Sequence, residues 1–62
     1  MTFELSKKEN ELVKQIRRNT DQAVALIKKN DVDEAIRNIV SARRAFSDLA
    51  VHVHRRAADN DN

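Results

Sequence analysis

The 62-residue sequence predicts an all-α fold, an antiparallel two-helix hairpin that dimerises into a four-helix bundle. Gly and Pro are both absent, which removes the residues that usually make tight hairpin turns and phosphate-binding loops. Apolar residues recur at steps of three and four along two segments, as they do on one face of an α-helix. A helix-capping spacing precedes each segment. We therefore expect one helical-hairpin domain over residues 1–62.

The first helix is expected over residues 7–29. Ser6 and Glu9 have the spacing of a capping box, in which each side chain bonds to the other residue's backbone amide. Lys28 and Lys29 fall in the last turn, where cations favour the negative end of the helix dipole. Thr20 lies within the apolar stripe, and its hydroxyl is expected to bond to a carbonyl one turn earlier, or else to pair across a two-fold axis. The stripe consists of Leu12, Val13, Ile16, Thr20, Ala23, Val24 and Ile27.

The second helix is expected over residues 32–57, after a turn at 30–31 and before a disordered tail at 58–62. Asn and Asp tolerate turn conformations, and Asp31 stands three residues before Glu34, which is a second capping-box spacing. Apolar residues then repeat in alternating steps of three and four, which predicts a heptad seam with Phe46 as a core anchor. This seam consists of Val32, Ala35, Ile39, Ala42, Phe46, Leu49 and Val53.

A single hairpin of this length buries too little apolar surface for comfortable stability, and the absence of Cys excludes disulfides. Each apolar stripe is also wider than one neighbouring helix can cover. We therefore expect a homodimer that acts as a non-enzymatic protein–protein interaction module, a small adaptor or regulator, with a further protein partner left open. The expected interface residues are Leu12, Val13, Ile16, Thr20, Ala23, Ile27, Ile39, Ala42, Phe46, Leu49 and Val53.

Basic residues occur in adjacent pairs, which offers an alternative function. In a hairpin that turns at Asn30 and Asp31, facing residue numbers sum to about 61. Arg17-Arg18 should then lie level with Arg43-Arg44, and Lys7-Lys8 with Arg55-Arg56, which predicts two basic bands across the hairpin. Between Lys7 and Arg56 there are 12 basic and 7 acidic residues, a net charge of +5. The alternative is a small regulator that binds RNA or DNA phosphates. Its candidate residues are Arg17, Arg18, Arg43, Arg44, Arg55 and Arg56.

Catalysis and metal binding are not expected. His52 and His54 are two residues apart, which on a helix points them about 160° apart and prevents chelation of one ion. Glu9 continues the apolar stripe and is expected to pair with Arg55 or Arg56 rather than to act as an acid catalyst. We expect no cofactor, no small-molecule substrate, no membrane span and a cytoplasmic location.

Two resemblances accompany this interpretation. The expected architecture is similar to that of the plasmid copy-number regulators known as Rop, and Asp31-Val32-Asp33-Glu34 looks like their turn. That tetrapeptide is a capping motif shared by many helices, so no RNA-binding residue is carried over. The segment from Asn30 to Phe46 looks like the turn and second helix of a tetratricopeptide unit, without its Gly and Tyr. We assign the chain to neither family.

Overall fold

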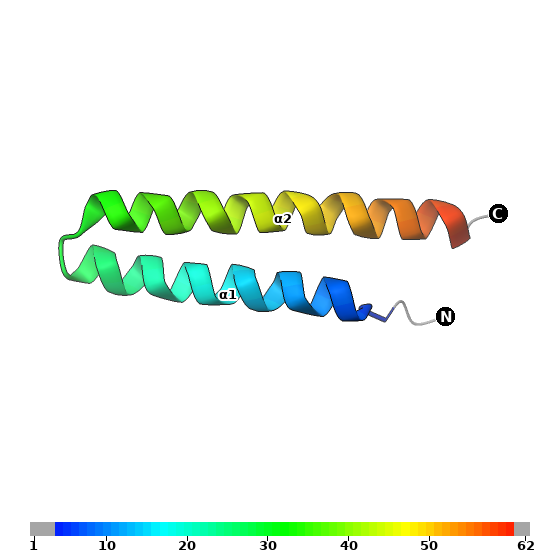
Figure 1. The fold of residues 1–62 in the computed structure, drawn as a ribbon, viewed down its shortest axis with the longest axis horizontal. Helices are drawn as coiled ribbons and strands as arrows, with labels where there is room; N and C mark the ends of the chain where they lie inside the picture. Colours follow the sequence, from blue (N-terminus) through cyan, green and yellow to red (C-terminus); the bar gives the residue numbers. More distant parts are fainter. Residues whose placement is uncertain (1–3, 61–62) are drawn as a thin grey trace.

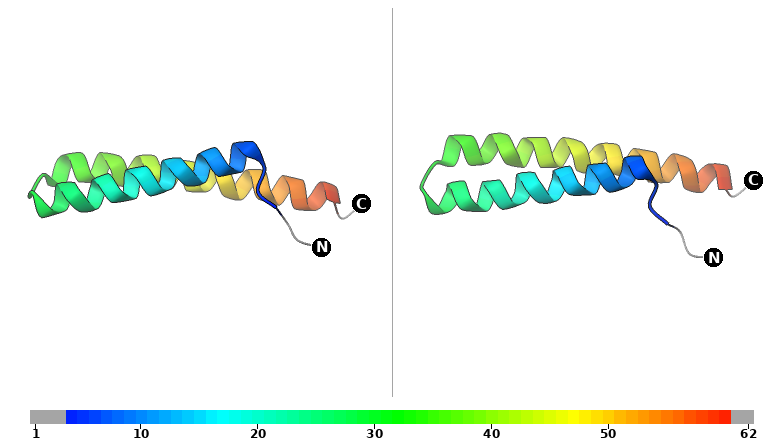
Figure 2. Two further views of the ribbon diagram at one scale, coloured as in Figure 1. Left: turned by 90° about the horizontal axis from the view of Figure 1, so that it is seen from below. Right: turned by 60° about the horizontal axis from the view of Figure 1, so that its bottom comes forward.

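Two antiparallel helices joined by a tight turn make up the protein, as the computed structural model shows for residues 4–60 (Figure 1). Helix α1 spans Lys7–Lys28 and helix α2 spans Val32–Asn60. The hairpin is a rod of 49 × 16 × 14 Å. The helices lie side by side along α1 in Figure 1 and in the right view of Figure 2, and the left view of Figure 2 shows them crossing at a shallow angle. The expected all-α hairpin is confirmed, and residues 4–60 contain no strand.

The start of α1 is fixed by the capping box that the sequence predicted. The Glu9 amide donates to the Ser6 hydroxyl at 3.2 Å, and the Ser6 amide donates to the Glu9 carboxylate at 2.9 Å. Two amides that the first turn would leave without partners are thus satisfied by side chains. This prediction is confirmed in both of its hydrogen bonds.

The turn depends on one residue with a left-handed backbone. Asn30 has a φ of 65°, a conformation that Asn adopts more readily than most residues. It allows the Asp31 amide to donate to the Leu26 carbonyl at 2.8 Å, while the Asp31 carbonyl accepts from the Ala35 amide at 3.1 Å as α2 begins. Helix α2 then continues to Asn60 instead of ending near 57, and residues 61–62 of the expected tail lie outside the described residues.

The contact between the helices follows a regular heptad alternation on both sides. The least exposed positions recur in steps of three and four, and the buried ones among them are short side chains, except for Leu12 and Glu9. Such small residues let two helix backbones approach closely. The seam consists of Glu9, Leu12, Ile16, Asn19, Ala23 and Leu26 from α1, and of Ala35, Asn38, Ala42, Ala45, Leu49, His52 and Arg56 from α2.

This seam differs from the heptad seam expected for the second helix. Ala35, Ala42 and Leu49 are shared by both, but the bulky members of the expected seam are replaced by Asn38, Ala45 and other small or polar residues. Phe46, the expected core anchor, is 62% exposed in the hairpin. The bulky residues follow the seam residues by one position, so their side chains point about 100° away from the seam and lie on the flank of α2. The heptad spacing was therefore predicted correctly, but the bulkiest apolar residues of α2 do not face α1.

The turn generates a test of stability. Replacing Asn30 with Val should lower the free energy of unfolding by about 1–2 kcal/mol, because a β-branched side chain is strained in the left-handed region. Replacing Asn30 with Gly should change it by less than about 0.5 kcal/mol or raise it slightly, since Gly adopts this conformation without strain. Urea denaturation followed by circular dichroism measures both. Equal values for the two variants would contradict the assigned turn geometry.

Candidate interaction surface

One side of the hairpin is lined by large apolar side chains from both helices. An open groove of about 390 Å³ crosses this side between Ile16 and Thr20 of α1 and Ile39, Ala42, Arg43 and Phe46 of α2. Heptad repetition extends the same side toward both ends of the hairpin. We call this side the apolar face. It consists of Val13, Ile16, Thr20, Val24 and Ile27 from α1 and Val32, Ile36, Ile39, Ala42, Phe46 and Val53 from α2.

Most of the bulky residues of this face are about half exposed. Val24, Ile27, Val32, Ile36 and Ile39 each show between 47% and 54% of their surface to solvent, and Phe46 shows more. A contiguous patch of exposed large apolar residues marks an interaction site more often than single, scattered apolar residues do.

The expected interface residues fall into two groups. Leu12 and Ala23 are buried in the seam between α1 and α2, and Leu49 lies at the same seam, so these three hold the hairpin itself together. The others lie on the apolar face, where Ile16 and Ala42 border both the seam and the groove. The Thr20 hydroxyl donates to the Ile16 carbonyl at 2.7 Å, the bond expected within one helix.

The side opposite the apolar face is polar. By heptad position it presents Lys8, Gln15, Gln22 and Lys29 from α1 and Glu34, Ser41, Asp48 and Arg55 from α2. A smaller pocket of about 260 Å³ places Val51 there beside Lys8, Asp48 and Arg55. Val51 and Ile39 are thus both branched, both half exposed and both on α2, but on opposite sides of the hairpin.

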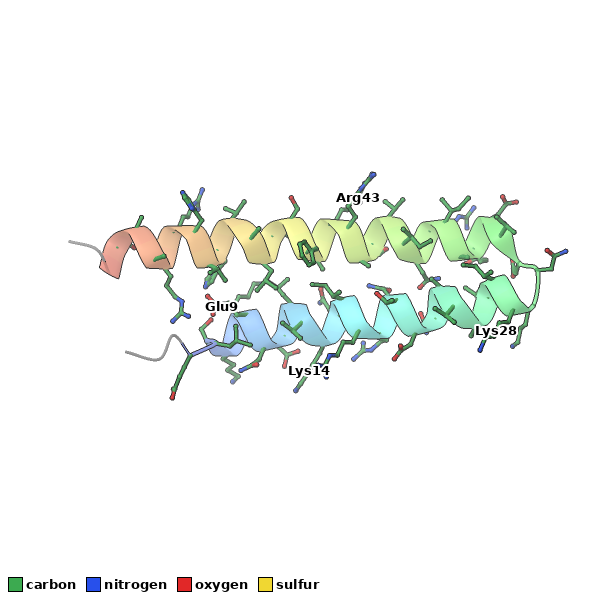
Figure 3. All side chains as sticks on the ribbon, turned by 180° about the vertical axis from the view of Figure 1, so that it is seen from behind. Glu9, Lys14, Lys28 and Arg43 are labelled. Atoms are coloured by element: carbon green, nitrogen blue, oxygen red, sulfur yellow. The ribbon has the colours of Figure 1, made fainter. Side chains whose placement is uncertain are left out.

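The candidate arginines do not form one band. Neighbouring residues on a helix point about 100° apart, so each Arg pair is divided between different sides of the rod. Arg43 lines the apolar groove, and it projects away from α1, whereas Lys14 and Lys28 project away from α2 (Figure 3). Arg56 is occupied by a carboxylate of α1, as described next. Each of the two expected bands is therefore divided among different sides of the rod.

A buried ionic cluster closes the open end of the hairpin. The Glu9 side chain is fully buried, and Arg56 Nη2 donates to its Oε1 at 2.8 Å while Arg56 Nε lies 2.8 Å from its Oε2. His52 Nε2 lies 3.4 Å from the same Oε2, and Arg56 also donates to the Glu4 carbonyl. Figure 3 shows Glu9 pointing toward α2. The expected pairing of Glu9 with Arg56 is confirmed; the neighbouring His52 was not foreseen as its partner.

The environment of Glu9 shifts its pKa. Burial is the largest single effect and would raise the pKa of this carboxyl. The hydrogen bond from the Ser6 amide, the charge and hydrogen bond of Arg56 and the smaller effect of His52 lower the pKa, and together they outweigh burial. The pKa of Glu9 therefore lies below its ordinary value of 4.5. The cluster thus prefers an ionised Glu9, which joins the start of α1 to the last turns of α2.

Comparisons with models of protein families, with curated protein sequences and with solved structures find no significant match to this chain. Within residues 4–60, neither helix has an apolar stretch that is long enough to cross a membrane. In that same part of the chain, no three carboxylate or imidazole side chains come together as ligands for a metal ion.

The lowered pKa of Glu9 predicts how stability depends on pH. The folded state favours the ionised carboxylate, so the contribution of the cluster is complete above about pH 4.5, the unfolded value, and is lost as the pH falls through the lower folded value. Thermal melting between pH 7 and pH 3 should show a steeper loss for the wild type than for Glu9→Gln, whose melting temperature should already be lower at pH 7. Parallel melting curves across this range would contradict the assignment.

Proposed function

We propose that this chain is a non-enzymatic interaction module whose apolar face binds a second copy of itself, forming a four-helix bundle that serves as a small adaptor or regulator. The observation that carries the proposal is the placement of the bulky apolar residues. Six of them, Val24, Ile27, Val32, Ile36, Ile39 and Phe46, are exposed outside the seam of the hairpin and lie on one face that spans both helices.

The large accessible surface of the hairpin supports the proposal that a partner covers part of it. The hairpin has an accessible surface of 5324 Å², whereas a compact monomer of its 7.1 kDa mass would expose about 4,100 Å². The excess of roughly 1,200 Å² is more than the approximately 800 Å² that each partner buries in a standard stable interface. The hairpin therefore exposes enough surface in excess of a compact protein for one interface of standard size.

A second copy fits this face better than a short peptide does. The apolar residues repeat along most of the rod, from Val13 to Ile27 on α1 and from Val32 to Val53 on α2. A covering partner must therefore be about as long as the hairpin and equally apolar. A two-fold interface also needs both protrusions and hollows on one surface. The groove meets this need, because its lining combines the short Thr20 and Ala42 with the bulkier Ile39 and Phe46.

The proposal is tested by two matched substitutions on α2. Ile39→Glu places a charge on the apolar face, and Val51→Glu places the same charge on the polar side, where the starting residue is equally exposed at 50% against 49%. In sedimentation velocity at micromolar concentration, the wild type and Val51→Glu should sediment at twice the 7.1 kDa chain mass. Ile39→Glu should sediment as a monomer, because a charge buried without a partner at the interface strongly opposes association.

Two results would contradict the proposal. A wild-type chain that stays monomeric throughout the micromolar range would remove the second copy. Equal effects of the two substitutions would show that the apolar face has no special part in association. Circular dichroism of both variants provides the control. Val51→Glu should keep the helicity and melting temperature of the wild type, whereas Ile39→Glu should be less helical at the same concentration, because folding is linked to association.

A further inference from the structure

The positive charge of the protein is concentrated on the outer surface of one helix. Helix α1 with its C-cap Lys29 carries seven basic residues, and the only exposed acidic residues on it are Glu11 and Asp21. Its third acidic residue, Glu9, is buried and paired with Arg56 of α2. Helix α2 carries five basic and four acidic residues, and one of the five is that Arg56. The solvent-facing side of α1 is thus about five charges more positive than that of α2.

Most of the cations on α1 follow its long axis on the side away from α2, and Lys8 and Lys29 adjoin them on the polar side of the hairpin. Lys7, Lys14 and Lys28 share one heptad position, opposite the seam, and Figure 3 shows Lys14 and Lys28 projecting outward. At about 1.5 Å per residue they stand at multiples of roughly 10 Å along some 30 Å of rod. We call this array the α1 basic surface, which consists of Lys7, Lys8, Lys14, Arg18, Lys28 and Lys29.

The chain neutralises this surface only in part. Asp21 shares the heptad position of Lys14 and Lys28 and stands between them, and Asp48 lines a pocket together with Lys8. Lys14 approaches Glu11 at 3.8 Å, and both side chains are largely exposed, so the attraction is weak. The surface also lies away from the apolar face, so the binding of a second copy leaves it open to solvent. Six cations fixed on a rigid helix would raise the local concentration of a long anion at this side of the molecule.

We propose that the α1 basic surface binds the phosphate backbone of a double-stranded nucleic acid without reading its sequence. A rod of about 30 Å lies along roughly nine base pairs, and the release of counterions from neutralised phosphates drives such binding. The surface has no aromatic residue on which unpaired bases could stack, which favours a duplex over a single strand. It also has no large apolar side chain that could enter a lipid bilayer, which disfavours a membrane. The proposal is separate from dimerisation, which depends on apolar contacts on another side of the hairpin.

Two triple variants with equal loss of charge test the proposal. One replaces Lys14, Arg18 and Lys28 of α1 with Gln, and the other replaces Arg37, Arg44 and Arg55 of α2 with Gln; all six side chains are exposed. Fluorescence anisotropy with 20-base-pair duplex DNA and duplex RNA measures affinity from about 50 to 200 mM salt. The α1 variant should bind at least tenfold more weakly than the wild type, with a salt slope lower by about 3, since each lost phosphate contact lowers the slope by about 1. The α2 variant should keep the wild-type slope within about 1.

Several outcomes would overturn the proposal. Equal losses in the two variants would show that net charge alone attracts the duplex. No binding of the wild type to either duplex at 50 mM salt would exclude the interaction, and binding confined to phosphatidylserine vesicles would assign the surface to a membrane instead. Sedimentation of each variant separates this proposal from the previous one, because both triple variants leave the apolar face intact and should remain dimers.

Discussion

The close approach of two helices along a seam of small residues determines how the rest of this protein is arranged. Ala23, Ala35 and Ala45 are buried where the helices meet, and at these levels the close approach leaves little room for bulky side chains. The larger aliphatic residues and Phe46 therefore lie on one flank, where a hairpin alone cannot cover them. A stable structure of this length needs more buried apolar surface than a seam of alanines provides. The unpaired flank and the small core are two consequences of the same packing.

The ionic cluster complements the small core by holding α1 and α2 together at the end of the hairpin away from the turn. The turn holds one end of the hairpin covalently, and the pairing of Glu9 with Arg56 holds the other. A buried carboxylate with donors from a backbone amide and a guanidinium gains little net stability against an apolar replacement, but it opposes any shift in register because another alignment would leave it unpaired. The alanines permit close contact, and the cluster selects which residues meet.

Much of the fold follows from local sequence signals, whereas the orientation of the helices about their axes does not. The capping box at Ser6 was predicted from the spacing of Ser6 and Glu9, and the turn from the tolerance of Asn30 and Asp31 for turn conformations. One of the two heptad positions of the α2 seam was predicted one residue too late, because Phe46 and its heptad partners are large apolar residues, which are usually buried in the nearest core. The other position, with Ala35, Ala42 and Leu49, was predicted correctly. The rotation becomes predictable once Glu9 is treated as a seam residue that requires His52 and Arg56 opposite it, since those positions continue the series of Ala45 and Leu49.

The central claim is that the hairpin is completed by a second copy, and the dependence of thermal stability on protein concentration tests it most directly. If folding and association are linked, the melting temperature must rise with concentration by mass action. We predict a rise of several degrees between about 1 and 100 μM chain, measured by circular dichroism. A melting temperature that stays constant over this hundredfold range would show that the hairpin is stable alone and would contradict the account.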